Sequence, residues 1–190
     1  MIRHPSSGTS CHLLPQGEKE IILGIDPGSI VTGFGLIEIH NKQPHYLASG
    51  AIKIKQDAPY LKLKEIYQGI AEIIKEYAPT TSAIEQTFMN KNAASALKLG
   101  QARGAAMTAL AMHDLEVAEY SAKQVKQAVV GYGAADKSQV AHMVKTLLKI
   151  KHKLQSDAAD ALAIALCHFH TQQSLLYLHG ATKIVRGRLL

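Results

Sequence analysis

The chain has 190 residues, of which 47% are apolar, and a formal net charge of +6. This length can bury the core of one compact domain, and no apolar run is long enough to span a bilayer, which argues against a membrane protein. The two cysteines, Cys11 and Cys167, lie too far apart for a disulfide framework or a zinc knuckle, so we expect a soluble protein of the reducing cytoplasm.

The first quarter of the chain predicts an extension followed by an antiparallel meander. Residues 1–19 mix Pro, Gly, Ser and His without periodicity, which predicts a flexible N-terminal extension. Three β-rich stretches follow at residues 21–26, 31–40 and 45–55. Short turn sequences separate them, and short turns join antiparallel strands.

A crossover comes next. Apolar residues recur at helical spacing from Pro59 until Pro79, and a short strand at residues 82–86 follows this helix. A strand, a helix and a second strand in this order normally return parallel within one sheet. The crossover therefore predicts that Glu85 lies beside Asp26, which ends the first strand.

The rest of the domain is predicted to be mostly helical. The order βββαβαβααα predicts one α/β domain at residues 20–170, with a mixed five-stranded sheet flanked by helices, and a basic C-terminal tail at residues 171–190. The remaining predicted elements are a helix at 93–113, a strand at 117–120 and helices at 122–130, 137–148 and 157–168.

The helix at residues 93–113 is rich in small residues. Its Gly100, Arg103 and Gly104 predict a face that another helix can approach closely. Self-association and packing within the chain explain such a face equally well.

Four acidic residues carry the main functional signal, since each stands in or beside an apolar run where an unpaired charge is costly. A shared ligand would offset that cost. Oxygen-only clusters suit a hard divalent cation such as Mg2+ or Mn2+, and pairs of these ions catalyse in-line phosphodiester hydrolysis. The leading hypothesis is therefore a nuclease. The four residues are Asp26, Glu85, Asp157 and Asp160.

Each acid also has a simpler interpretation. Asp157 and Asp160 stand three positions apart at a helix start, where they share one face but could also serve the helix dipole and cap. Asp26 precedes Pro-Gly and could form an Asx turn. Glu85 is the hardest to explain structurally, because a Glu in a short apolar strand needs a cationic partner.

The positive charge is confined to the last part of the chain. Residues 1–120 hold 11 basic and 12 acidic residues, whereas residues 121–190 hold 10 basic and 3 acidic residues. A basic surface around carboxylates suits a nucleic acid whose phosphate reaches a metal ion. A solvated basic helix face has the same composition, so charge alone leaves both interpretations open.

Four segments bear a family resemblance, and they run in the family's order over nearly all of residues 20–170. They are GIDPGSIVTGFG at 24–35, AIEQTFMNKNAASALKLGQARG at 83–104, AKQVKQAVVGYGAADKSQV at 122–140 and SDAADALAIA at 156–165. The sequence resembles the RuvC family of bacterial Holliday-junction resolvases. This resemblance implies an RNase H-like fold of the retroviral-integrase superfamily and a homodimer that nicks four-way DNA junctions symmetrically in recombination and repair. The branch-migration proteins RuvA and RuvB are its expected partners.

The resemblance also implies roles for single residues. Lys126 and Lys137 match family lysines that serve junction binding and catalysis, and Phe88 matches an aromatic residue that stacks on or wedges against bases. Two Mg2+ ions per active site are expected, with Mn2+ as a substitute. The residues at the positions of the family's catalytic, metal-binding carboxylates are Asp26, Glu85, Asp157 and Asp160.

Three other functions compete with this interpretation. An RNase H-like nuclease of ribosomal RNA precursors also uses an early Asp and a late acidic pair, but the segment at residues 85–104 argues against it. An actin-like or sugar-kinase ATPase needs two such domains, whereas this chain has the length for one. A non-catalytic junction-binding module predicts the loss of at least one carboxylate, and all four are present.

Two further groups of residues yield expectations. Lys149, Lys151 and Lys153 are hypothesised to strengthen phosphate contact near the acids. His168 and His170 show no zinc-ligand spacing, so we expect structural or exposed roles for them rather than catalysis.

Overall fold

A mixed five-stranded sheet organises the fold in the computed structural model of the chain, which describes residues 20–86, 92–179, 184–185 and 188–189. The strand order is β3-β2-β1-β4-β5. The first three strands pair antiparallel, whereas β4 pairs parallel with both β1 and β5. The predicted meander, crossover and mixed sheet are therefore confirmed. The strands are β1 (Glu20–Asp26), β2 (Val31–His40), β3 (Gln43–Lys53), β4 (Thr81–Glu85) and β5 (Val117–Tyr120).

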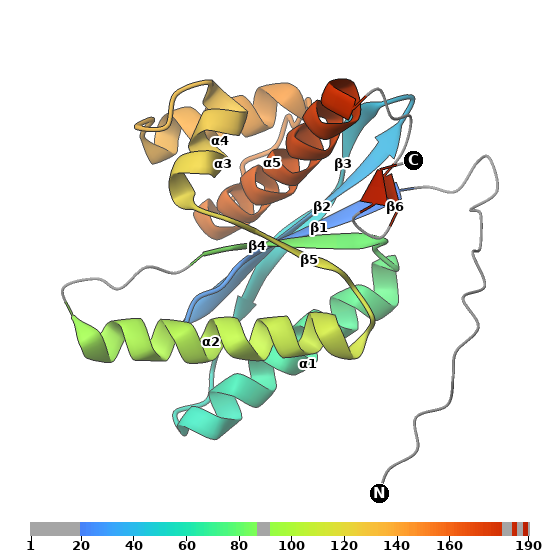
Figure 1. The fold of residues 1–190 in the computed structure, drawn as a ribbon. Helices are drawn as coiled ribbons and strands as arrows, with labels where there is room; N and C mark the ends of the chain where they lie inside the picture. Colours follow the sequence, from blue (N-terminus) through green and yellow to red (C-terminus); the bar gives the residue numbers. More distant parts are fainter. Residues whose placement is uncertain (1–19, 87–91, 180–183, 186–187, 190) are drawn as a thin grey trace, which may run out of the picture.

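Helices cover both faces of this sheet (Figure 1). One face packs against α1 and α2, and the other packs against α3, α4 and α5. No helix among the described residues is long and apolar enough to cross a membrane. The helices are α1 (Pro59–Tyr77), α2 (Ala93–Met112), α3 (Ala122–Val130), α4 (Lys137–Leu147) and α5 (Ser156–His179).

Most predicted boundaries fall within one residue of the observed ones, but those of β3 and the end of α5 differ by more. Helix α5 runs to His179 rather than ending at residue 168, because no Gly or Pro interrupts the sequence before Gly180. It therefore crosses the predicted domain boundary at residue 170, and β6 (Ile184–Val185) and β7 (Arg188–Leu189) pair beyond it. Strand β3 starts at Gln43 because the hairpin turn uses only Asn41 and Lys42, both with positive φ.

Side chains alternate between the two layers along β1. Ile22 joins the cluster that includes Leu162 and Leu166 of α5, whereas Leu23 and Ile25 join the cluster under α1 and α2. Gly24, on the α5 side, lets the two backbones touch, because a Cβ there would lie 2.2 Å from the carbonyl oxygen of Ala161. The small residue therefore sets how closely α5 approaches the sheet.

His168 of α5 lies in a buried polar network with side chains of β4 and β5. Only 7% of the residue is exposed. Its Nδ1 shares a hydrogen bond of 2.8 Å with the hydroxyl of Tyr120, and its Nε2 lies 3.2 Å from the hydroxyl of Thr81. Burial lowers the pKa of His168 to about 4. These partners confirm a structural role.

The network predicts a loss of stability at acidic pH. The unfolded chain protonates His168 near pH 6.5, whereas the folded protein does so only near pH 4. The unfolded state therefore binds more protons between these values, and the free energy of unfolding falls as pH drops through this window, by up to roughly 3 kcal/mol.

Urea unfolding at several pH values checks this prediction. His168→Asn should remove that part of the pH dependence, while His113→Asn, at an exposed position, should retain it. Equal pH dependence in the wild type and His168→Asn would contradict the assignment.

Candidate active site

Two of the four acids lie side by side at the end of the sheet. Strands β1 and β4 run parallel with Ile25 opposite Ile84, so the next residues, Asp26 and Glu85, end neighbouring strands. Both acids are partly buried. Asp26 and Glu85 therefore lie beside each other, as predicted. They stand at the carboxyl ends of parallel strands, which is where α/β sheets usually bind ligands.

Helix α5 brings the other two acids to the same place. Gly33 of β2 pairs with Asp26, and a Cβ on Gly33 would lie 2.2 Å from the backbone oxygen of Asp157. The first turn of α5 therefore lies directly against the Asp26–Gly33 pair. Asp160 follows Asp157 by one turn on the same face of the helix.

The charges of the acids act on one another. Burial, with added repulsion from Glu85, Asp160 and Asp157, raises the pKa of Asp26 to about 7. Burial and the charge of Asp160 likewise raise the pKa of Glu85. The fold thus holds acids from β1, β4 and α5 within electrostatic reach of one another.

The two predicted lysines lie at the edge of this acid cluster. Lys137, the first residue of α4, places its Nζ 2.9 Å from Oδ2 of Asp160, and this contact raises the pKa of the lysine. The positive charge of Lys137 also partly offsets the rise in the pKa of Asp26 and Glu85. Lys126 of α3 has the same effect on Glu85. Both lysines thus supply positive charge beside the acids.

Local capping positions Lys137. Asp136 occupies the N-cap of α4, and its Oδ1 accepts hydrogen bonds from the backbone N–H of Gln139 at 2.9 Å and the hydroxyl of Ser138 at 2.7 Å. A capped helix start holds its first residue in a defined direction. The third late acid is therefore structural, which leaves Asp157 and Asp160 for the site.

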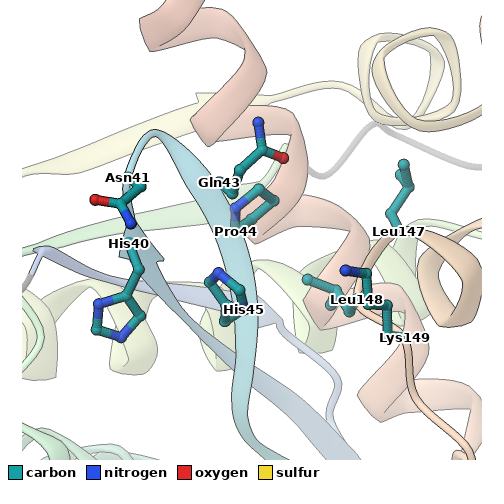
Figure 2. Close-up of a pocket in the computed structure, with 8 residues that line it drawn as sticks. All are labelled: His40, Asn41, Gln43, Pro44, His45, Leu147, Leu148 and Lys149. Atoms are coloured by element: carbon teal, nitrogen blue, oxygen red, sulfur yellow. The ribbon is translucent and has the colours of Figure 1, made fainter.

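Other predicted contacts fall elsewhere. Phe88 lies outside the described residues. A cavity of about 210 Å³ between the β2–β3 turn and the end of α4 is lined by His40, His45 and Lys149, among others (Figure 2). His40 ends β2 and Gly33 lies near its start, so Lys149 stands at the far end of the sheet from the acids. This position argues against the hypothesis that Lys149 contacts phosphate near them.

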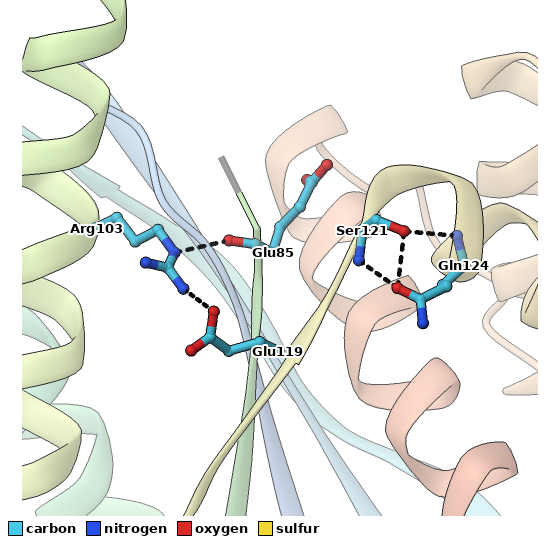
Figure 3. A network of polar contacts seen from close by, with 5 residues as sticks. All are labelled: Glu85, Arg103, Glu119, Ser121 and Gln124. Carbon is cyan, nitrogen blue, oxygen red and sulfur yellow. Dashed lines mark hydrogen bonds and ion pairs between the residues drawn. The ribbon is translucent and has the colours of Figure 1, made fainter. Parts of the chain in front are cut away.

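Arg103 also differs from its prediction. The sequence grouped it with Gly100 and Gly104 on one helix face, but its side chain turns inward to the sheet. Its Nε donates to the carbonyl oxygen of Glu85 at 3.2 Å, and its guanidinium pairs with Glu119 of β5 (Figure 3). Neighbouring helical residues point about 100° apart, so helical spacing could have separated Arg103 from Gly104.

The donor chemistry of the acid cluster fits a hard divalent cation. All four side chains offer carboxylate oxygens, the ligands that Mg2+ and Mn2+ prefer. Within residues 20–86 and 92–179, no group of three or more His, Cys, Asp or Glu side chains is arranged closely enough to hold a metal ion. The acids therefore lie near enough to influence one another's pKa, but their side chains are not gathered around a single point.

Comparison with known proteins identifies the family. The model of the family described as crossover junction endodeoxyribonuclease RuvC matches residues 22–168. The chain belongs to the RuvC family. Its sheet and helices accordingly form an RNase H-like fold.

The relatives cover most of this chain. The crossover junction endodeoxyribonuclease RuvC of Pseudoalteromonas translucida is 58% identical over 89% of this chain and 98% of its own length. That of Francisella philomiragia is 56% identical over 89% of this chain and 99% of its own. A solved structure of Thermus thermophilus RuvC in complex with Holliday junction substrate has 32% identity and a TM-score of 0.75, covering 82% of this chain and 96% of that one.

The electrostatics of the site predict that Asp26→Asn stabilises the protein. The folded state keeps Asp26 protonated up to about pH 7, against an ordinary pKa of 3.8. The folded state therefore binds more protons across this window, and stability falls as pH rises through it. Without divalent metal at pH 8, Asp26→Asn should raise the free energy of unfolding by up to about 4 kcal/mol.

Denaturant unfolding in EDTA at pH 8 measures this change. Asp57→Asn, at an exposed position, provides the matched control and should change stability little. An Asp26→Asn protein no more stable than the wild type would show that the acid is not held at electrostatic cost.

Proposed function

We propose that the protein resolves four-way DNA junctions by metal-assisted hydrolysis of phosphodiester bonds at the acid cluster. The observation that carries the proposal is the placement of four acids at one end of the sheet, within electrostatic reach of one another, in a chain of the RuvC family. The acids are Asp26, Glu85, Asp157 and Asp160, from β1, β4 and α5. The solved Thermus thermophilus relative in complex with Holliday junction substrate supports the choice of DNA.

The four carboxylates would hold the metal. Two Mg2+ ions, or Mn2+ in their place, supply activation of a water molecule and stabilisation of the leaving 3′ oxygen when bound. Burial, with added repulsion between the acids, raises the pKa of Asp26 and of Glu85, and a bound cation would offset both costs. No side chain needs to act as the nucleophile. Asp157 and Asp160, on one face of α5, complete the oxygen ligands from the other layer.

Lys126 and Lys137 are proposed to bind the junction backbone. Lys137 is 77% exposed although it pairs with Asp160, so its ammonium can also meet a phosphate beside the acids. Lys126 is partly exposed on α3, and its positive charge opposes the rise in the pKa of Glu85. The proposal keeps Phe88 as a residue that stacks on bases at the junction core.

Two symmetrical nicks in strands of like polarity require two active sites, and we propose a homodimer formed through the outer face of α2. Leu97 and Met112 are 66% and 68% exposed on this helix. Gly100 and Gly104 between them have open space beside their Cα atoms. An exposed face with apolar ends and small central residues suits close packing with a second copy.

The proposed setting is recombination and DNA repair in the cytoplasm, with RuvA and RuvB as partners. The two alternative activities are less well supported. The curated relatives over most of the chain are crossover junction endodeoxyribonucleases, which disfavours processing of ribosomal RNA precursors. The retained set of four acids disfavours a non-catalytic module.

The proposal predicts that Asp157→Asn separates cleavage from binding. Removing this carboxylate should abolish detectable cleavage in Mg2+, while junction binding stays the same or tightens because repulsion of phosphate falls. Calcium should support binding without cleavage, because its looser coordination positions the attacking water poorly.

A synthetic four-way junction, a linear duplex and an RNA–DNA hybrid are the substrates for this assay. The wild type should cut the junction in preference to both controls, and Asp136→Asn, which keeps a helix-capping residue, should retain cleavage. Preferential cutting of the hybrid would favour the ribonuclease alternative, and an active Asp157→Asn protein would refute the metal assignment.

The dimer proposal predicts that Gly104→Arg yields monomers. A Cβ at this position meets nothing within 4 Å, and Arg favours a helix more than Gly does, so the protomer should fold normally. Sedimentation equilibrium should give twice the chain mass of 20.6 kDa for the wild type and the chain mass for the variant.

Gln68→Arg, at an exposed position on α1, is the matched control and should remain dimeric. A dimeric Gly104→Arg protein would exclude the α2 face as the interface.

A further inference from the structure

We infer that Arg103 is a positioning residue of the active site, which fixes the end of β4 and through it the Glu85 carboxylate. The inference rests on the proposed role of Glu85 as a metal ligand. Arg103 contacts the backbone carbonyl of Glu85 and the carboxylate of Glu119 rather than the carboxylates of the four acids. It acts through the backbone.

One guanidinium joins two strands to one helix. Arg103 extends from α2 with 19% of its side chain exposed. Its Nε donates to the carbonyl oxygen of Glu85 at 3.2 Å, while the same group pairs with the carboxylate of Glu119. Glu119 lies opposite Ile84 in the β4–β5 ladder. Arg103 therefore contacts both strands close to the point where β4 ends.

The contact acts where the sheet supports β4 on one side only. The pairing of β4 with β1 stops at Ile84, one residue before Glu85. On the other side, the backbone N–H of Gln86 still donates to the carbonyl of Tyr120 at 2.8 Å. Arg103 adds a side-chain bond to the Glu85 peptide at this edge. Since the carboxylate moves with its own backbone, a turn of this peptide would displace the ligand.

The geometry leaves the carboxylate available. Arg103 approaches Glu85 from the α2 side, whereas the side chain of Glu85 points away from it toward α3 and α5 (Figure 3). The cations that act on the pKa of Glu85 are Lys137 and Lys126. Because Glu119 pairs with the guanidinium, Arg103 holds the strand without competing with a metal ion for the Glu85 oxygens.

Arginine suits this role better than lysine. Its planar group carries several N–H donors in fixed directions, so it can bond a carbonyl and a carboxylate at once. A lysine keeps the charge but has a single ammonium on a flexible stem, and it cannot reproduce both contacts with the same geometry. Arg103→Lys therefore removes the positioning while conserving the charge.

The test measures single-turnover junction cleavage as a function of Mg2+ concentration in the wild-type protein and Arg103→Lys. A misplacement of about 1 Å in a catalytic group costs about 100-fold in rate, so we expect a 10–100-fold lower rate at subsaturating Mg2+. The half-saturating Mg2+ concentration should rise several-fold. Junction binding in Ca2+, the dimer mass and the unfolding midpoint should stay close to wild type.

Two further variants keep the test decisive even if Arg103→Lys does not fold. One changes Glu119 in β5, and the other changes Glu116 just before β5. Glu119→Gln removes the ion pair with the guanidinium, so it should also raise the half-saturating Mg2+ concentration, by a smaller factor than Arg103→Lys. Glu116→Gln is the matched control, because this exposed side chain precedes β5 and makes no contact with Arg103 in the structure. It should behave as wild type.

The outcomes distinguish this inference from the proposed function. Wild-type protein that fails to cut junctions at any Mg2+ concentration would overturn the proposed function. Wild-type cleavage with an unchanged Mg2+ dependence in both Arg103→Lys and Glu119→Gln would overturn the positioning role alone. A loss of activity that only follows a loss of folded protein, without a shift in Mg2+ dependence, would also overturn it.

Discussion

Repulsion among partly buried carboxylates is the interaction on which the rest of this structure depends. Asp26 shows the cost of holding these acids together, since burial first and repulsion from three neighbouring acids second raise its pKa to about 7. Such an arrangement lasts only where the surrounding fold holds each acid more firmly than the charges push it away. The parallel register of β1 with β4 fixes two of the acids, and the close approach of α5 at Gly33 fixes the others.

Two kinds of positively charged residue lie near the acids. Lys137 and Lys126 act on the acids from α4 and α3, and both remain exposed enough to meet a phosphate. Arg103, by contrast, is mostly buried and bound to a backbone carbonyl and Glu119, so its charge serves the scaffold. The exposed cations therefore lie on the side proposed to bind DNA, and the largely buried Arg103 lies on the α2 side of β4. His168 belongs to neither group, because it is neutral within its own network.

Much of the site could be predicted because it depends on local patterns. Short turns and one crossover determined that Asp26 and Glu85 end adjacent strands, and an apolar run after Asp160 determined that α5 packs on the sheet. The incorrect predictions concern geometry that residue type does not specify. The two-residue turn at Asn41 and Lys42 moved the start of β3. Arg103 turned inward because a carbonyl and a carboxylate from strands remote in sequence meet there.

The central claim is that the four acids share divalent metal ions, and anomalous diffraction from manganese tests it most directly. Crystals of the wild type with an uncleavable four-way junction would be soaked in Mn2+. The account predicts anomalous peaks within bonding distance of Asp26 and of the acids from β4 and α5. Well-ordered DNA at the acid cluster with no manganese on any of the four carboxylates would contradict it.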